Sequence, residues 1–227
     1  MARKSRAATL SDESQAAGAP TAKERIVDAA EMLFAQQGYE GTTTRAIALK
    51  AGVPLGLMSY YFGTKGELYS EVIMRRSAEH AADIAASLRA VAARGKQASI
   101  ADMVTAFVMP VVRRAIEGGP GWAAYVKLLS LAANTPGSEP HTKTFAREYA
   151  RVVEDFIGML RQKMPGAAEE DVYWGFYILN SAFIHILVEN GSIDRLSGGR
   201  CRASDLETVA KKLALVFDAG IARLAKG

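Results

Sequence analysis

The sequence predicts an all-α fold, made of an N-terminal three-helix head and a C-terminal helical-bundle body. Apolar residues recur at helical spacing from Ile26 to Leu224, and no strand pattern is present from about Ser99 onward. Capping boxes of the Thr-x-x-Glu type open two of the helical segments. A chain of 227 residues with 49% hydrophobic content can also bury a sizeable core.

The chain begins with a tail and a first helix. Residues 1–20 are polar, carry Arg3, Lys4 and Arg6, and lack periodicity, so we expect a disordered basic tail. Two roles stay open for this tail, a solvated segment and a basic arm that contacts phosphates. The first capping box, Thr21 to Glu24, starts a helix that runs to about Gln37, and Gly38 ends it.

Two short helices at a sharp turn are predicted between Thr42 and Leu68, in the stretch TTTRAIALKAGVPLGLMSYYFGTKGEL. Small and apolar residues give the first helix its inner face, and Gly52 can adopt the left-handed conformation that ends it. Val53 is expected to start the second helix, from which Met58 and Phe62 point back at the first. This arrangement is a helix-turn-helix. The alternative is a plain helical hairpin inside a larger bundle.

The outward surface of this unit suits a nucleic acid. The second helix carries no acidic residue, so it can enter a DNA groove without electrostatic penalty. A threonine cap at Thr43 or Thr44 leaves free N–H groups beside Arg45, a combination that holds a phosphate, and Arg45 is also the candidate for reading a base. Lys65 could clamp another phosphate. The predicted DNA contacts are Thr43, Thr44, Arg45, Leu55, Gly56, Ser59, Tyr60, Tyr61 and Lys65.

The segment GTTTRAIALKAGVPLGLMSYYFGTKGELY closely resembles the DNA-binding signature of the TetR family of bacterial repressors. The match runs through Thr43, Ile47, Ala48, Ala51, Gly52, Val53, Gly56, Phe62, Lys65 and Leu68. Two positions depart from the commonest pattern: Pro54 replaces a Ser or Thr cap, and Ser59 replaces a Tyr. The resemblance implies a head that binds operator DNA and a body that dimerises and encloses a ligand.

The second capping box, Thr64 to Glu67, is expected to open a helix that continues to about Ala93. We assign residues 21–67 to the DNA-binding domain and residues 68–227 to the body. Pro110 predicts a kink or a break in its helix. The other helical segments expected in the body are 100–117, 122–133, 140–163, 169–189 and a final helix capped by 204–207, with a polar loop at 195–202.

The overall composition is typical of a cytoplasmic protein. The net charge of +4 is compatible with nucleic acid, and Cys201 is the only cysteine, so we expect a reducing compartment. The basic, polar N-terminus does not fit a signal peptide. Residues 172–188 are very apolar but contain Asn180 and Ser181, so a buried helix and no membrane contact are predicted.

An enzyme is the competing class of protein, but the sequence lacks the residue patterns of catalytic and metal-binding sites. The three histidines lie on separate segments, and no helical pair of metal ligands exists, so no metal, cofactor or catalytic residue is predicted. No phosphate-binding glycine loop is present. Cys201 lies between Arg200 and Arg202, whose positive charges favour the thiolate form. Two roles therefore stay open for Cys201, a redox-sensing thiol and an incidental surface cysteine.

The body is expected to form a two-fold homodimer and to hold an effector. Helices 169–189 and 204–224 should pack as a four-helix bundle, since the final apolar stripe is too long to leave in water. The predicted pocket draws on Met103, Phe107, Trp122, Tyr125, Leu129, Phe156, Tyr177 and Asn180, unless these side chains simply fill the core. An anionic headgroup would lie near Arg113, Arg114 or Lys127.

The expected function is that of a transcriptional regulator, a repressor released from operator DNA by an apolar small molecule. The body is also similar to the TetR subgroup that senses fatty acids or their thioesters, which makes a fatty acid or acyl thioester a candidate effector. A ligand-independent regulator or an activator with the same head is the alternative. The effector, the operator and the regulated genes are not encoded in any pattern of the chain.

Overall fold

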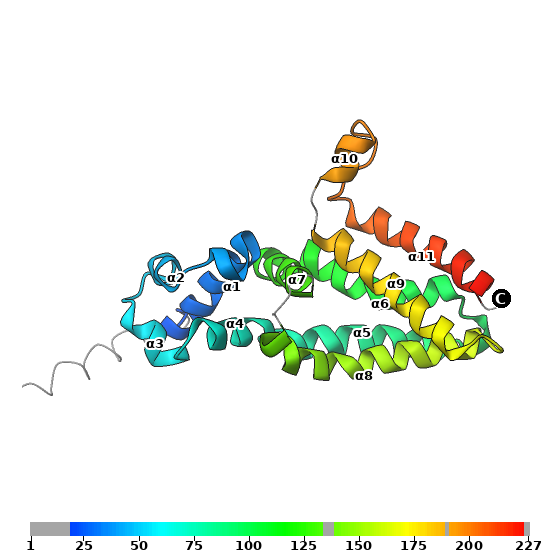
Figure 1. Ribbon diagram of the computed structural model, residues 1–227, viewed down its shortest axis with the longest axis horizontal. Coiled ribbons are helices and arrows are strands. Elements are labelled where there is room, and N and C mark those ends of the chain that lie inside the picture. Colours follow the sequence, from blue (N-terminus) through cyan, green and yellow to red (C-terminus); the bar gives the residue numbers. More distant parts are fainter. Residues whose placement is uncertain (1–18, 134–138, 189–190, 225–227) are drawn as a thin grey trace, which may run out of the picture.

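The helices form two groups along one long axis, with α1–α4 at one end and α5–α11 at the other (Figure 1). The computed structural model describes residues 19–133, 139–188 and 191–224, and within these ranges every regular element is helical, as predicted. The tail prediction for residues 1–18 lies outside the described residues. The helices are α1 Ala22–Gly41, α2 Thr44–Ala51, α3 Gly56–Phe62, α4 Lys65–Met74, α5 Ser77–Ala92, α6 Ile100–Glu117, α7 Gly119–Ala133, α8 Glu139–Lys163, α9 Glu169–Val188, α10 Ser192–Leu196 and α11 Leu206–Leu224, with a 3₁₀ turn at Gly95–Gln97.

The first helix begins and ends as its local chemistry predicts. The Thr21 hydroxyl accepts a hydrogen bond from the Glu24 amide, and the Glu24 carboxylate accepts from the Thr21 amide at 2.7 Å. Gly38 leaves the helical conformation with φ of 71°, so the last residues of α1 follow a kink. The buried Thr42 hydroxyl donates to the Gly38 carbonyl at 2.8 Å and fixes this bend.

The helix-turn-helix differs from the prediction at one point. Thr43 caps α2 and Gly52 ends it in the left-handed conformation, both as expected. The second helix, however, starts at Gly56 and not at Val53. The Val53 amide donates to the Ala48 carbonyl at 3.0 Å, so Val53 closes α2, and the Leu57 amide of the next helix donates to the Pro54 carbonyl at 3.0 Å.

A single helix from Thr64 to Ala93 was predicted, and this prediction was wrong. The chain leaves the helical conformation at Arg76, with φ of −115° and ψ of 2°, which separates α4 from α5. Both arginines at the break are drawn to α1: Arg75 pairs with Asp28, and Arg76 pairs with Glu31. Tertiary ion pairs therefore end a helix whose local sequence would continue.

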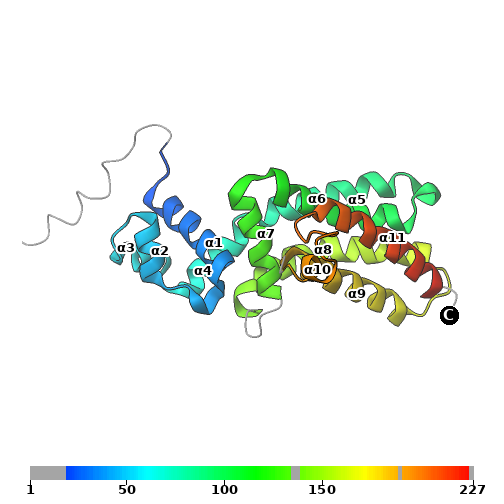
Figure 2. The ribbon, with the colours of Figure 1, turned by 90° about the horizontal axis from the view of Figure 1, so that it is seen from above.

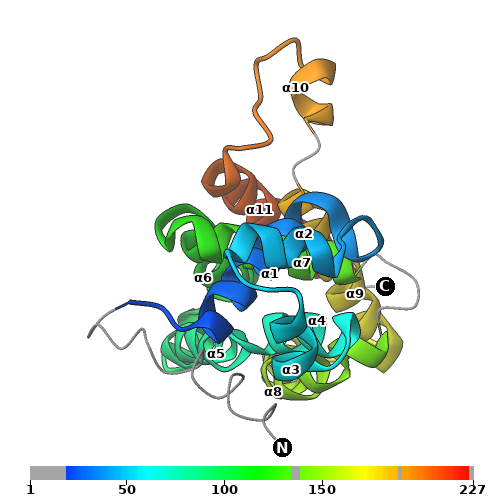
Figure 3. The same cartoon turned by 90° about the vertical axis from the view of Figure 1, so that its left-hand side faces the viewer.

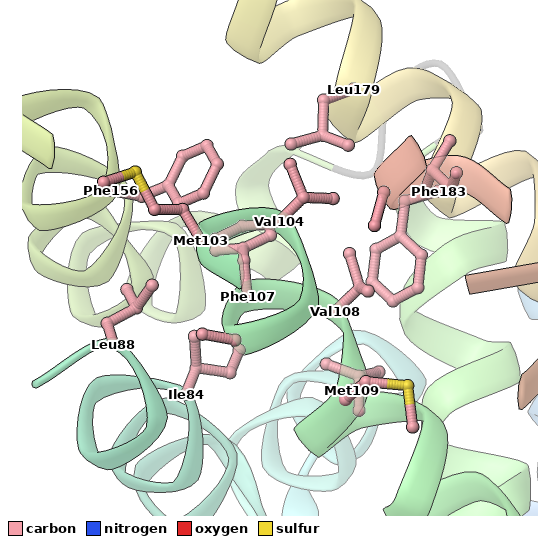
Figure 4. Packing of buried hydrophobic residues seen from close by; sticks show 14 of the residues in the cluster. Ile84, Leu88, Met103, Val104, Phe107, Val108, Met109, Phe156, Leu179 and Phe183 are labelled. Carbon is pink, nitrogen blue, oxygen red and sulfur yellow. The ribbon is translucent and has the colours of Figure 1, made fainter. Parts of the chain in front are cut away.

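The body packs around α6, which lies between α5, α7, α8 and α11. Phe107 and Val108 are fully buried there, with Phe156 of α8 and Phe183 of α9 nearby (Figure 4). The helix runs through Pro110 without a break. Asp218 of α11 accepts a hydrogen bond from the Ala101 amide at 3.0 Å and so satisfies a free N–H at the start of α6.

Two other expectations for the body need correction. The loop expected at 195–202 begins within a short helix, α10, which projects from the body (Figures 1 and 3). Helix α9 was expected to be buried, but only one side of it is, through residues such as Leu179 and Phe183. Among the described residues α9 is the one helix with the length and hydropathy of a membrane span, and it packs against α7, α8 and α11.

Candidate nucleic-acid interface and body cavity

The predicted DNA contacts lie at the free end of the head, where α2 and α3 meet solvent (Figure 2). Met58 and Phe62 are 4% and 9% exposed and anchor α3 against the head core. Because these anchors face inward, the opposite side of the helix faces outward. The exposed candidates are Thr43, Arg45, Leu55, Gly56, Ser59, Tyr60 and Tyr61, whereas Thr44 and Lys65 are partly buried.

The N-terminus of α2 is open to an anion. The Thr43 hydroxyl accepts from the Ala46 amide at 3.1 Å and leaves the amides of Thr44 and Arg45 without a partner within the helix. The first turn contains no acidic residue, and Arg45 is exposed there. The helix dipole and the guanidinium therefore favour negative charge at the same place.

The surface of α3 combines apolar and aromatic groups with positive charge nearby. Tyr60 is 78% exposed and Leu55 is 51% exposed, while the Tyr60 and Tyr61 rings pack edge to face at 5.1 Å. Residues 41–66 contain three basic side chains and no acidic one. Such a surface meets the phosphates and base edges of a duplex without charge repulsion.

Lys65 has an internal role that the sequence did not indicate. Its ammonium donates to the carbonyls of Tyr39 at 2.9 Å and Thr42 at 3.2 Å, and it lies 4.1 Å from the centre of the Tyr39 ring. These contacts tie the start of α4 to the turn between α1 and α2. A phosphate contact by Lys65 would have to share the ammonium with these carbonyls.

A second internal contact of the head was also missed. Arg25 of α1 donates from Nε to the Ala51 carbonyl at 3.2 Å and from a terminal nitrogen to the Pro20 carbonyl at 3.1 Å. The first bond satisfies a free carbonyl at the end of α2. Its sequence signal was weak, because Arg25 stands among other charged residues on an exposed helix face.

A half-open cavity of about 290 Å³ reaches into the body between α5, α6, α7, α8 and α9. Of the predicted ligand contacts, Leu129 and Asn180 line it. Met103, Phe107 and Phe156 are packed in the core instead, and Trp122 and Tyr125 are buried in α7. Tyr177 lies on the outer side of α9 and is 62% exposed.

The cavity has apolar walls and a few uncharged polar groups, which are His80, Ser130, Tyr149 and Asn180. Burial lowers the pKa of His80 to about 4, so its imidazole is neutral at pH 7. Its ring lies 5.7 Å from that of Tyr149 and 5.9 Å from that of Tyr125. None of the described lining residues is Lys, Arg, Asp or Glu.

The cations predicted to hold an anionic headgroup lie elsewhere. Arg113 and Arg114 border an open groove between α5 and α6 that also contains Asp83 and Glu117. Arg114 donates to Asp83 at 2.7 Å, a hydrogen bond that raises the pKa of the guanidinium, and it stacks on Trp122 at 4.5 Å. Lys127 borders another groove, beside α1.

His80, Ser130 and Tyr149 were missed as cavity residues. For His80 a signal existed, because it precedes Ile84 by four residues and Leu88 by eight and so shares their buried face. Ser130 and Tyr149 depend on how α7 and α8 pack against α5 and α9. That packing is not readable from either helix alone.

The head has the geometry of a helix-turn-helix DNA-binding protein. Residues 26–72 match the family described as "Bacterial regulatory proteins, tetR family", and residues 105–220 match "Tetracyclin repressor-like, C-terminal domain". The chain belongs to the TetR family of transcriptional regulators. The proteins of this family that it resembles are regulators and not enzymes.

Individual relatives agree with this assignment. The probable HTH-type transcriptional regulator YttP of Bacillus subtilis (strain 168) is 43% identical over 51 residues, which are 22% of this chain and 25% of that protein. The match thus spans about a quarter of the curated relative and corresponds in length to a head alone.

Solved structures extend the likeness of the fold to the body. A TetR-like transcriptional regulator from Rhodococcus sp. RHA1 has a TM-score of 0.59 at 17% identity, over 88% of this chain and 97% of that one. The regulator FadR from Bacillus subtilis in complex with stearoyl-CoA has a TM-score of 0.58 at 13% identity, over 84% and 96%. At these identities the likeness concerns the fold.

Proposed function

We propose that this protein is a dimeric transcriptional repressor of the cytoplasm, which binds operator DNA through α2 and α3 and is released by an uncharged, largely apolar effector. The observation that carries the proposal is the exposed, acid-free surface of α3 beside the open N-terminus of α2. This surface combines a free helix N-terminus, an adjacent arginine and exposed aromatic groups.

In this proposal α3 enters the major groove and α2 lies across the phosphate backbone. The amides of Thr44 and Arg45 hold a phosphate, and Tyr60, Tyr61, Ser59 and Thr43 contribute further contacts to the backbone or to base edges. Leu55 and Gly56, at the start of α3, let the helix approach the base edges closely. Arg45 contacts a guanine, the base that a guanidinium reads best.

The proposed dimer uses the exposed sides of α9 and α11, which lie next to each other along the body (Figure 2). Tyr173, Trp174, Tyr177 and Ile178 of α9 are 50 to 62% exposed, and Leu215 and Val216 of α11 are 61% and 67% exposed. Large exposed apolar side chains on two neighbouring helices are typical of a subunit interface. Regulators of the family act as dimers, which supports this choice.

The cavity supports an effector and indicates its chemistry. An anionic headgroup buried there would meet neutral His80 and no cation among the described lining residues, so its desolvation would not be offset. We therefore favour a neutral molecule, or an acyl chain whose charged end stays outside. FadR, whose structure contains stearoyl-CoA, has the same fold and supports the acyl-chain form.

A ligand-independent regulator is the second candidate function, and the cavity disfavours it. A body that only dimerises has no need for a void of about 290 Å³ with four polar side chains in its wall. An effector can release DNA only through a higher affinity for the DNA-free arrangement of the heads. A shift from 99:1 to 1:99 needs a difference of about 10⁴-fold.

Selection from a random duplex library tests the DNA-binding proposal. The library must be long enough for two half-sites about 34–36 Å apart, the spacing that a two-fold dimer reads on one side of DNA. We expect enrichment of a palindrome-like sequence. A pool that stays random through repeated rounds would contradict a sequence-specific repressor.

Calorimetry then tests the effector. Neutral apolar compounds and acyl chains of graded length are titrated into the free protein and into its operator complex. We expect tighter binding to the free protein for the inducing class. Equal affinity for both forms removes a compound as an inducer, and the absence of binding by every class would favour the ligand-independent regulator.

A further inference from the structure

A short arm projects from the body between the two helices of the proposed dimer face. The arm comprises residues 191–205 and includes α10, and it extends away from the ends of α9 and α11 (Figures 1 and 3). It does not fold back on its own subunit, since Leu196 is 83% exposed and Ile193 is 41% exposed.

The arm is an ordered hairpin and not a loose connection. The Asp194 carboxylate accepts from the Ala203 amide at 2.9 Å, and the Asp194 carbonyl accepts from the Gly199 amide at 2.8 Å. The Ser197 hydroxyl accepts from the Cys201 amide at 2.9 Å. These bonds preorganise the arm, so docking it costs little conformational entropy.

A groove opens at the root of the arm, where the head joins the body. It has a volume of about 360 Å³, and Leu187 and Leu206, the helix residues that flank the arm, belong to its wall. The wall also includes Met32 and Gln36 of α1 and Ala123 and Lys127 of α7, and its other residues are small or apolar. The groove is therefore mainly apolar, and it contacts both the head and the body.

We propose that each arm docks on the partner subunit of the dimer, with Ile193 and Leu196 covering the groove at the root of the partner's arm. The inference rests on the proposed dimer. The arm projects on the side of the α9 and α11 face, where a second copy would lie. The proposed function requires both heads to face one duplex, so the two-fold axis runs parallel to the long axis of the subunits. Such an axis places the two arm roots at the same level, so each arm projects toward the head end of the other subunit.

A second copy of this chain is the occupant that the geometry favours. The arm and the groove lie at the same end of one face, and the arm, though otherwise polar, exposes two apolar side chains, Ile193 and Leu196, that match the apolar wall of the groove. One two-fold operation would therefore bury this contact twice. Because the groove includes residues of α1, a docked arm would contact the partner's head. The arm would then link the position of each head to the other subunit.

Sedimentation of a Leu196→Glu variant tests the proposal. Two copies of this contact are lost per dimer, so we expect the dimer dissociation constant to rise on the order of a hundredfold. Leu49→Glu is the matched control, because Leu49 is also 83% exposed but lies on α2, away from the body. It should leave the dissociation constant unchanged.

The outcomes separate the arm from the dimer itself. A wild-type dimer that Leu196→Glu does not weaken overturns the arm proposal alone. A wild-type chain that is monomeric at micromolar concentration overturns the proposed dimer, and the arm proposal with it.

Disulfide trapping gives a second, independent readout. In a Cys201→Ser background, one chain carries Leu196→Cys and the other carries Ala123→Cys, and the two are mixed and oxidised. We expect a covalent heterodimer, and none when Leu49→Cys replaces Leu196→Cys. A heterodimer yield equal to that of the Leu49→Cys pair would contradict docking in this groove.

Discussion

The guanidinium of Arg76 and the carboxylate of Glu31 form a buried ion pair where the head meets the body, with Nε to Oε1 at 3.0 Å. The Glu31 side chain is 2% exposed and that of Arg76 is 20% exposed. Arg76 also lies over the Trp122 ring at 5.0 Å. The pair therefore joins α1, the break between α4 and α5, and the start of α7. These three segments lie between the proposed DNA-binding surface of the head and the cavity of the body.

Removal of one partner of this pair should destabilise the protein strongly. Arg76→Ala leaves the buried Glu31 carboxylate with one weaker ion pair, to Arg75 at 3.7 Å, and breaking a buried pair costs about 3–5 kcal/mol. Urea unfolding measures the loss. The exposed pair Arg161–Glu169 is the control, and Arg161→Ala should cost no more than about 1 kcal/mol. Similar losses in both variants would contradict the special role of the junction.

Gly121 should be intolerant of a side chain for the same reason. An added Cβ would lie 2.6 Å from Nη2 of Arg76 and 3.2 Å from Oε2 of Glu31, so Gly121→Ala must displace the ion pair. Gly158 of α8 has no atom within 4 Å of such a Cβ, and Gly158→Ala should stabilise the protein by about 0.4–1 kcal/mol. Thermal unfolding should show shifts of opposite sign, and a stabilising Gly121→Ala would contradict the contact.

His80 should make stability fall in mild acid. Its folded pKa of about 4 lies below the ordinary value of 6.5, so the unfolded chain binds a proton first as pH falls. Stability from this group is complete above pH 6.5 and is lost between 6.5 and 4, by at most about 1.4 kcal/mol per pH unit. Asp83, Tyr125 and Tyr149 face the imidazole, and only Asp83 opposes the shift.

The His80→Gln variant isolates this effect. It cannot titrate in this range, so its free energy of unfolding should fall less than that of the wild type between pH 7 and pH 5. Urea unfolding at the two pH values measures the difference. Identical losses in the two proteins would show that His80 is solvated and not buried in the cavity wall.

Val216 is a sharper probe of the dimer face than its apolar neighbour Phe217. Phe217 packs against the body core, so its replacement would disturb folding, whereas Val216 is 67% exposed. Val216→Glu should dissociate the dimer and leave the helical content unchanged. Sedimentation measures the dissociation and circular dichroism measures the helical content. A Val216→Glu protein that remains fully dimeric would show that the dimer interface does not include this part of α11.

Arg45 and Lys65 should behave differently on DNA. Arg45→Ala should cost about 1–3 kcal/mol of binding and flatten the preference at one base pair of each half-site. Lys65→Ala should lower the affinity for all DNA sequences alike. It should also destabilise the head, because the Lys65 ammonium donates to the carbonyls of Tyr39 and Thr42. An Arg45→Ala variant with unchanged sequence preference would refute base readout by this residue.

Local chemistry explains which parts of the fold were predictable. The caps at Thr21, Thr43 and Thr64 and the left-handed Gly52 depend on neighbours within a few residues, and the structure confirms them. The start of α3 was misplaced because a bond of Val53 to α2 decides it. The end of α4 was missed because it depends on the ion pair of Arg76 with Glu31, which is far away in the sequence.

The candidate sites divide in the same way. The exposed face of α3 follows from helical periodicity, since Met58 and Phe62 identify the buried side. The cavity required knowledge of how five helices pack. Large aromatic side chains such as Phe107 and Phe156 were expected to line it, but they fill the core, and smaller residues around His80 leave the void.

Fluorescence anisotropy at about 0.15 M salt, with the selected duplex and a scrambled duplex of equal composition, tests the central claim most directly. If α3 reads sequence in the major groove, the wild type should prefer the selected duplex by at least about 10³-fold. Equal affinity for the two duplexes would mean that the acid-free face of α3 does not recognise an operator, and would contradict the account.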